Sequence, residues 1–194
     1  MLKNSILSRI TSFLGLKKKS ITFSHFRDSL GNFELFYPSG WKFDEDIAVI
    51  DGKYTISFDA KDGLSTFTIS IDGSLPPKFN FASYAKTQLE SPTSGIYTSI
   101  KRGKFKGMAA YTREYTYISS GRTYFGGGVM FFTGEIVGSI SWSAPQNERE
   151  TFEGIFRHML DSLTVREGFL VKRRKKIVQG KIIEMGIMKG IKET

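Results

Sequence analysis

The sequence predicts one α+β domain, built on an antiparallel sheet of about six or seven strands, with a basic extension at each end. Short runs of alternating apolar and polar residues recur along the chain and are separated by turn residues. Two other segments, residues 81–90 and 148–161, have the apolar spacing of amphipathic helices. The 194 residues are 40% hydrophobic and 14% aromatic, which is typical of a β-rich globular protein with a full core.

Residues 33–41, Phe-Glu-Leu-Phe-Tyr-Pro-Ser-Gly-Trp, open the predicted domain. Apolar residues alternate along 33–37, which indicates a strand with a buried face. Pro38 and Gly40 end that strand in a turn, and Trp41 follows where a large ring can close one end of the core. We therefore assign structural roles to Tyr37, Pro38, Gly40 and Trp41, and to Trp142 in the last predicted strand.

Six further strands are predicted in two groups. Residues 53–59 and 64–71 form a hairpin around the turn at 60–63. A meander follows, in which short Gly- and Ser-containing turns connect strands at 96–105, 108–118, 122–132 and 135–143. Gly126, Gly127 and Gly128 lie inside its third strand, without the Lys-Ser/Thr of a phosphate-binding loop. They indicate a bulge, or a strand that another element crosses closely.

The two predicted helices lie before and after the meander. The first ends at Ser91-Pro92, because a residue before proline disfavours helical geometry. The second has a strong apolar stripe and leads into an exit segment at 162–165. The stripe consists of Phe152, Ile155, Phe156, Met159, Leu160 and Leu163.

Charge divides the chain into three parts. Residues 1–21 contain 5 basic and no acidic residues, residues 22–166 contain 15 basic and 16 acidic ones, and residues 167–194 contain 8 and 3. A near-neutral domain thus lies between basic tails, so affinity for a polyanion would belong to the tails. Candidate anion- or partner-binding residues are Lys17, Lys18, Lys19, Lys172, Arg173, Arg174, Lys175 and Lys176.

The N-terminal segment has three possible roles. Its apolar residues recur at helical spacing, and it is rich in Ser and basic residues. This pattern suits an organelle transit peptide, a helix lying on an anionic membrane, or a helix docked on its own domain. The C-terminal tail mixes isoleucines with glycines, so we expect it to fold only on a partner or on the domain.

Residues capable of catalysis or metal binding do not form a recognisable constellation. The chain has no cysteine and two histidines, of which His25 falls in the predicted linker before the first strand and His158 beside the apolar stripe of the second helix. Asp44, Glu45 and Asp46 are weak candidates for a hard cation, and we expect them in a solvated loop. The basic run at 101–106 lies beside aromatic residues, but nucleic acid binding is not favoured, since the domain is near neutral. No cofactor is expected.

The order of elements adds a resemblance. With Tyr37-Pro38-Ser39-Gly40-Trp41 at its start and Asp161-Ser162-Leu163-Thr164-Val165 at its end, the chain resembles the PsbP family over about residues 32–165. The resemblance implies an antiparallel sheet with helices packed on both faces, and no active site. The family includes extrinsic subunits of photosystem II on the lumenal side of the thylakoid membrane and proteins that assist assembly of photosynthetic complexes. A Ran-binding nucleotide-release factor and bacterial accessory proteins share the fold.

The resulting expectation is a non-enzymatic accessory or assembly subunit of a larger, membrane-associated protein complex. One alternative is a peripheral membrane or polyanion-binding protein that acts through its basic tails. Another is a small-GTPase-binding module. The location depends on residues 1–20: an organelle, either mitochondrion or chloroplast, if they are a transit peptide, and otherwise the cytoplasm or a membrane surface. No apolar run is long enough to span a bilayer.

Overall fold

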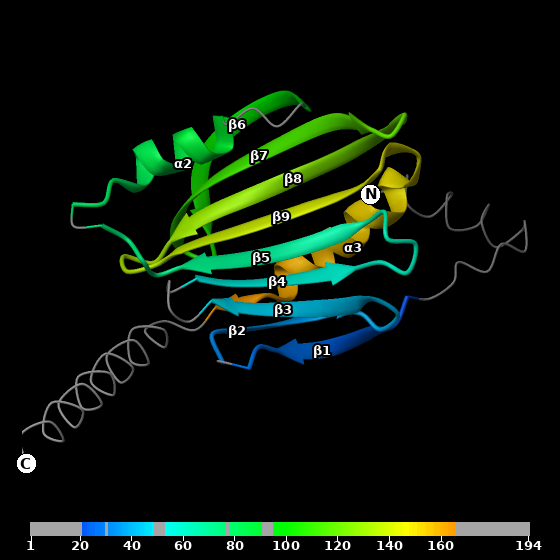
Figure 1. Cartoon of the computed structure of the whole chain (residues 1–194), viewed down its shortest axis with the longest axis horizontal. Coiled ribbons are helices and arrows are strands. Elements are labelled where there is room, and N and C mark those ends of the chain that lie inside the picture. The colour runs from blue at the N-terminus through cyan, green and yellow to red at the C-terminus, as the bar shows by residue number, and fades with distance from the viewer. Residues whose placement is uncertain (1–20, 30, 49–52, 77, 91–94, 166–194) are drawn as a thin grey trace, which may run out of the picture.

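The computed structural model describes residues 21–165 except for 30, 49–52, 77 and 91–94 (Figure 1). These residues form ten strands in two sheets, two α-helices and a short 3₁₀ helix at Gln146–Glu148. The strands are β1 (Phe23–Arg27), β2 (Phe33–Pro38), β3 (Lys42–Ala48), β4 (Lys53–Asp59), β5 (Thr66–Asp72), β6 (Gly95–Phe105), β7 (Met108–Ser119), β8 (Arg122–Phe132), β9 (Val137–Pro145) and β10 (Thr164–Val165). The helices are α2 (Phe81–Glu90) and α3 (Arg149–Ser162).

The large sheet has seven antiparallel strands in the order β3-β4-β5-β9-β8-β7-β6. Two-residue turns connect the first three strands of its meander. Lys106 and Gly107 join β6 to β7, and Ser120 and Gly121 join β7 to β8, all four with positive φ between 49° and 84°. Positive φ at both central residues matches the right-handed twist of a hairpin. The hairpin at 53–72, the meander and both helices are found where the sequence predicts them.

A second sheet corrects two sequence-based expectations. It has the antiparallel order β1-β2-β10, so the residues before Phe33, interpreted as a linker, contain a strand, and the exit segment contributes another. Asp28 holds the turn between β1 and β2, because its buried Oδ1 accepts a hydrogen bond of 2.8 Å from the amide of Phe33. The two unpredicted strands, β1 and β10, are short and lack a clear periodic pattern, and each is stabilised by pairing with β2.

The main core lies between the large sheet and a layer made of the small sheet and α3. Its largest fully buried side chains come from all three of these elements: Phe33, Leu35, Tyr54, Ile56, Phe58, Phe67, Ile69, Ile71, Phe131, Ile140, Phe156 and Met159. Trp41 packs at the edge of this core, with its ring centroid 6.1 Å from Phe152 and 6.2 Å from Phe156. Trp41 thus lies against the edge of the core, next to α3.

The opposite face of the large sheet is covered at one end alone. Met130 and Val137 face α2 and form a second cluster with Ala85 and Leu89. Successive strand residues alternate between faces, so this cluster and the main core lie on opposite sides of the sheet. The expectation of helices packed over both faces is therefore not supported as a whole, because each face carries a single helix and the small sheet covers much of one face. One layer is a β-sheet with a single helix, and the other is one short helix that leaves most of its face open (Figure 1).

The three consecutive glycines of β8 make room for aromatic rings. A Cβ atom at Gly127 would lie 2.3 Å from Cζ2 of Trp142, and one at Gly126 would lie 2.7 Å from the ring of Tyr115. The pairing of β8 with β7 and β9 continues through the glycines without a register shift. Close approach by a neighbouring element is thus confirmed, and the alternative of a bulge is wrong.

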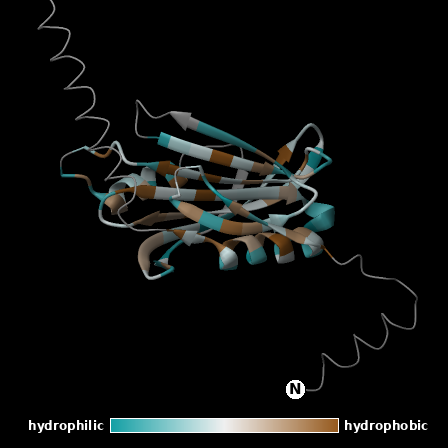
Figure 2. Cartoon of the chain, turned by 90° about the horizontal axis from the view of Figure 1, so that it is seen from below, coloured by the Kyte–Doolittle hydropathy of each residue, from teal (hydrophilic) through white to brown (hydrophobic). Residues whose placement is uncertain are grey.

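The hydropathy of the fold follows these layers. Figure 2 shows hydrophobic and hydrophilic residues alternating along the strands and along the helix beneath the sheet. This alternation is the period-2 and period-3.6 pattern expected of half-buried strands and helices. In the part of the chain that the structure describes, no helix is long and apolar enough to cross a bilayer.

Candidate functional site

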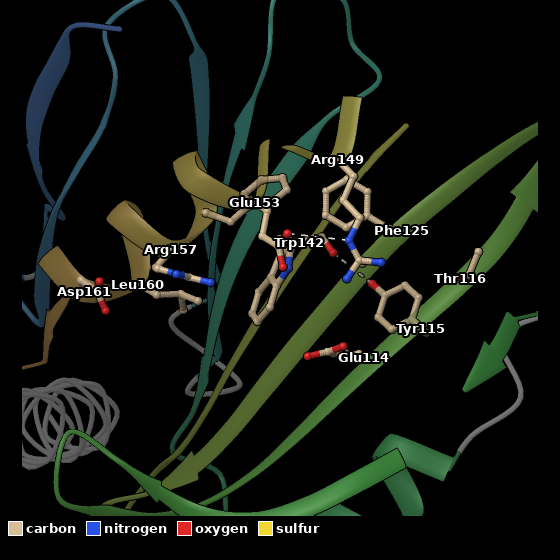
Figure 3. A pocket seen from close by; sticks show the side chains of 12 residues that line it. Glu114, Tyr115, Thr116, Phe125, Trp142, Arg149, Glu153, Arg157, Leu160 and Asp161 are labelled. Carbon is tan, nitrogen blue, oxygen red and sulfur yellow. Dashed lines mark hydrogen bonds and ion pairs between the residues drawn. The ribbon is translucent and has the colours of Figure 1, made fainter. Parts of the chain in front are cut away.

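A groove runs between α3 and the strands β7, β8 and β9, with a volume of about 230 Å³ (Figure 3). We call it the α3 groove. Its lining comes from four elements, β7, β8, β9 and α3: Glu114, Tyr115, Thr116, Phe125, Gly126, Trp142, Arg149, Glu153, Phe156, Arg157, Leu160 and Asp161.

One wall of the groove is a charged stripe on α3. Arg149, Glu153, Arg157 and Asp161 follow one another at intervals of four residues, which places them along one side of the helix. The Arg149 Nε atom lies 3.7 Å from a carboxylate oxygen of Glu153. Both side chains are nearly half exposed, so this ion pair contributes little to stability and leaves the charges accessible to a ligand.

The floor of the groove is aromatic. Trp142 projects from β9 into the space that Gly127 leaves, and its ring centroid lies 6.3 Å from that of Phe156 and 6.4 Å from that of Phe67. Because Phe67 and Phe156 are fully buried, the indole is held from below while part of it stays accessible. The guanidinium carbon of Arg149 lies 5.3 Å from the centroid of Phe125, within cation–π range.

The second wall is β7, where Glu114 and Thr116 line the groove. The side chain of Tyr115, between them in sequence, belongs to the other face of the sheet by strand alternation. Its hydroxyl donates a hydrogen bond of 3.3 Å to the main-chain oxygen of Trp142. This bond ties β7 to the strand that carries the groove floor.

The side chains that line the groove offer ion pairing and ring stacking. The lining offers two guanidinium groups, three carboxylates, the threonine hydroxyl and an aromatic floor, and none of its side chains is a histidine, lysine, serine or cysteine. Guanidinium–carboxylate pairing and stacking on an indole are the contacts by which protein surfaces recognise other chains, and Trp and Arg are enriched among their energetic hot spots. The groove can therefore hold a polypeptide segment that carries both acidic and basic residues.

The sheet face that α2 leaves uncovered is a second accessible surface. Its central strands present small hydroxyl side chains, several of which bond to each other, as Thr55 with Ser70 at 3.1 Å and Ser57 with Thr68 at 3.2 Å. Towards β7 the surface becomes aromatic, where the rings of Tyr117 and Tyr124 stack with centroids 5.0 Å apart and Tyr115 lies below the guanidinium of Arg113. The hydroxyl pairs occupy part of the bonding capacity of this face, which therefore offers fewer anchoring groups than the α3 groove.

The titratable groups with the clearest pKa shifts lie away from the groove. Burial raises the pKa of Glu45, but hydrogen bonds from Tyr54 and Ser29 outweigh it, so the pKa of Glu45 is lowered overall. Burial, with the neighbouring Glu45 carboxylate, raises the pKa of Tyr54, so its hydroxyl stays a donor. Burial also raises the pKa of Tyr84, with a smaller contribution from Asp72. These groups stabilise the fold and do not form an acid–base pair in a cleft.

The acidic cluster predicted to lie in a loop is part of a strand. Asp44, Glu45 and Asp46 belong to β3, where Asp44 and Asp46 point to one face and Glu45 to the other. The three carboxylates therefore do not converge on one point. Across the described ranges, no group of three or more acidic or histidine residues is arranged to hold a metal ion.

The histidines and the basic strand end are also placed. His25 lies in β1, with Nε2 3.5 Å from a carboxylate oxygen of Glu34. His158 is exposed on α3, and its ring centroid lies 4.0 Å from that of Phe23. Residues 101–106 form the end of β6 and its turn, where Lys106 donates a hydrogen bond of 2.6 Å to the main-chain oxygen of Asp161 at the end of α3.

Of the residues singled out from the sequence, the structure describes those with structural roles but not the basic residues of the tails. Tyr37, Pro38, Gly40, Trp41 and Trp142 all lie in the described fold, and Trp142 also lines the α3 groove. The basic candidates Lys17–Lys19 and Lys172–Lys176 lie outside the described residues. Sequence reasoning missed the groove, although the four-residue charge spacing from Arg149 to Asp161 was a signal for it.

Comparisons with solved structures show the fold. PsbP from the cyanobacterium Synechocystis sp. PCC 6803 matches with a TM-score of 0.55 and 12% identity, over 77% of this chain and 96% of that one. A structure from Bacteroides thetaiotaomicron matches with a TM-score of 0.52 and 18% identity, over 74% of this chain and 48% of that one. No protein-family model matches the chain, and no curated protein matches its sequence. At these identities the likeness establishes a PsbP-like fold and nothing about activity.

Proposed function

We propose that this protein is a non-enzymatic accessory or assembly subunit of a larger, membrane-associated protein complex, and that the α3 groove is its docking site. The observation that supports this most directly is the groove itself. An indole held by buried rings lies beside two arginines and three carboxylates, on a rigid helix and sheet. Preorganised aromatic and arginine side chains are what a docking surface requires.

The distribution of charge supports different roles for the domain and its tails. The domain is near neutral, with 15 basic and 16 acidic residues between 22 and 166, whereas the two tails carry the excess of basic residues. A neutral surface with paired charges favours specific contacts, and an excess of basic charge favours long-range attraction to an anionic surface. In this proposal the groove selects the partner and the tails hold the subunit near it.

Charge reversal in the groove tests the proposal. We would express the tagged full chain in its native cells, solubilise gently, and separate complexes on native gels with mass spectrometry of the co-migrating proteins. Arg149→Glu with Arg157→Glu should remove the complex, because losing hot-spot arginines weakens binding by about 30-fold or more. Arg102→Glu with Lys104→Glu on β6 is the matched control, since it makes the same change in net charge outside the groove.

The two variants distinguish docking through the α3 groove from attraction by net charge. Loss of the complex in the groove variant, with retention in the β6 variant, supports docking through the α3 groove. Equal loss in both variants would show that net charge holds the complex and that the groove is not the docking site. A complex that survives both variants would contradict the proposal.

A further inference from the structure

Both basic tails are attached to the small sheet. The N-terminal tail enters β1 at Phe23, which pairs with Pro38 of β2, and the amide of Ser39 fixes this junction by donating to the oxygen of Thr22. The C-terminal tail leaves β10 after Val165, which pairs with Phe33 at the other end of β2. From the rise along a strand and the spacing between strands, the two junctions are about 20 Å apart. The small sheet thus lies between two basic segments.

The outer face of the small sheet, which points away from the core, carries accessible apolar side chains. Because Phe26, Phe33 and Leu35 face the core, the alternate residues of β1 and β2 face outward. Phe36 is 45% exposed there, and Ile21 at the tail junction is 44% exposed. Two of the four large hydrophobic side chains that are most exposed in the described residues therefore lie at this sheet or its junction.

The polar groups on the outer face do not give it an acidic excess. Glu34 lies 3.5 Å from His25 and opposite Arg27 in the register of β1 and β2. Both histidines of the chain reach this region, His25 beside Phe36 with ring centroids 5.1 Å apart, and His158 of α3 against Phe23. An anionic surface would meet aromatic rings, histidines and one arginine, with a single carboxylate that already has a basic neighbour.

We propose that the outer face of the small sheet rests on an anionic lipid bilayer, with Phe36 and Ile21 entering the headgroup region and the two basic tails holding the sheet from both ends. Aromatic and aliphatic side chains beside basic segments are what a peripheral membrane contact requires, since buried apolar area and attraction to anionic lipid add. The outer face is formed by β1 and β2, whereas the α3 groove lies between α3 and β7–β9. A bilayer contact would thus leave the groove to a protein partner, and the inference does not depend on the proposed docking site.

Labelled vesicle binding tests the orientation. The chain has no cysteine, so single substitutions give unique labelling positions. Full-length protein carrying a polarity-sensitive dye at Phe36→Cys, Ile21→Cys or Ile118→Cys would be mixed with vesicles of phosphatidylcholine, with or without phosphatidylserine, at low and high salt. Ile118, on β7, is the control, because it is 69% exposed and lies outside the small sheet.

The expected result is a blue shift of the labels at positions 36 and 21 on vesicles that contain phosphatidylserine, and no shift at position 118. Phe36→Ser should weaken vesicle binding about fivefold, since nearly half of the ring remains to be buried. Ile118→Ser should leave binding within about twofold of the unmodified chain. Circular dichroism would verify that both serine variants are folded.

Three outcomes would overturn the inference. The first is that the chain fails to bind phosphatidylserine vesicles at low salt. The second is that the chain binds but the labels at positions 36 and 21 do not shift, which would mean that the tails bind while the sheet stays in water. The third is that the label at position 36 is insensitive to vesicles but becomes protected in the native complex, which would make the outer face a protein interface.

Discussion

Gly127→Ala tests the packing that builds the floor of the α3 groove. The added Cβ atom would lie 2.3 Å from Cζ2 and 2.7 Å from Cε2 of Trp142. A Cβ atom essentially never lies within 3.0 Å of a heavy atom in a residue that is not its chain neighbour, so the ring must move. It cannot move freely, because Phe67 and Phe156, both fully buried, pack against it.

The expected cost is that of overpacking a well-filled core, about 1–3 kcal/mol. For a domain of this size, each kcal/mol lowers the midpoint of thermal unfolding by roughly 2–4 °C, so the expected decrease is about 2–12 °C. Thermal and urea unfolding, followed by circular dichroism, would measure it. Trp142→Phe in the same chain should recover part of the loss, because the smaller ring leaves space for the new methyl group.

Gly103→Ala in β6 is the control. It is also a strand glycine, but a Cβ atom there would have no heavy atom within 4 Å. It should leave stability unchanged or raise it slightly, since alanine restricts the unfolded chain. If Gly127→Ala and Gly103→Ala were equally stable, the indole would not be held over Gly127, and the description of the groove floor would be wrong.

Two further predictions concern a buried hydrogen bond and the core. Tyr54→Phe removes the donor 2.6 Å from Glu45 Oε1. The folded-state pKa of Glu45 is lowered, so its contribution is fully present above the ordinary glutamate value of 4.5 and is lost below it, as pH falls through the lower folded-state pKa. Urea unfolding at a series of pH values should show a smaller acid-dependent loss in the variant, and an unchanged pH profile would contradict this. Phe156→Ala should cost about 3–5 kcal/mol of unfolding free energy, against under about 0.5 kcal/mol for the exposed Thr151→Ala. Similar losses for the two would show that α3 does not anchor the core.

Six of the seven strands of the large sheet, all except β3, were predictable because their signals are local. The alternation of apolar residues in 53–59 and 64–71, and the two-residue turns at 106–107 and 120–121, define strands and antiparallel neighbours without knowledge of the rest of the chain. The same holds for α3, whose apolar stripe has helical spacing. Element type and connection length therefore follow from the sequence.

The strands β1, β3 and β10 were not predictable in the same way, although β2 was. β1 (Phe23–Arg27) has Ser and His between its phenylalanines and Arg after them, and β10 has two residues. β3 places the three acidic residues Asp44–Asp46 within a strand, because its pairing with β4 outweighs their low β-propensity. These strands are stabilised by pairing with other strands, and their own residues show no local pattern that predicts this pairing.

Some features of the α3 groove could likewise be predicted from the sequence, and others could not. The charged stripe from Arg149 to Asp161 can be read from its four-residue spacing, and Trp142 from its place in a strand. That Gly127 lies beneath the indole, and that β7 supplies Glu114 as the opposite wall, depends on the register of three strands. The register determines which residues meet across the strands, and no local pattern in the sequence shows that these side chains lie together.

The central claim, that the protein binds a partner through the α3 groove, is tested most directly by site-specific photo-crosslinking in native cells. A photoreactive amino acid would replace Glu153, on the wall of the groove, or Lys104, on β6 as the control. If the groove is the docking site, we expect a discrete protein adduct, larger than the 21.9 kDa chain, from position 153 and not from position 104. The same adducts from both positions, or none from position 153, would contradict it.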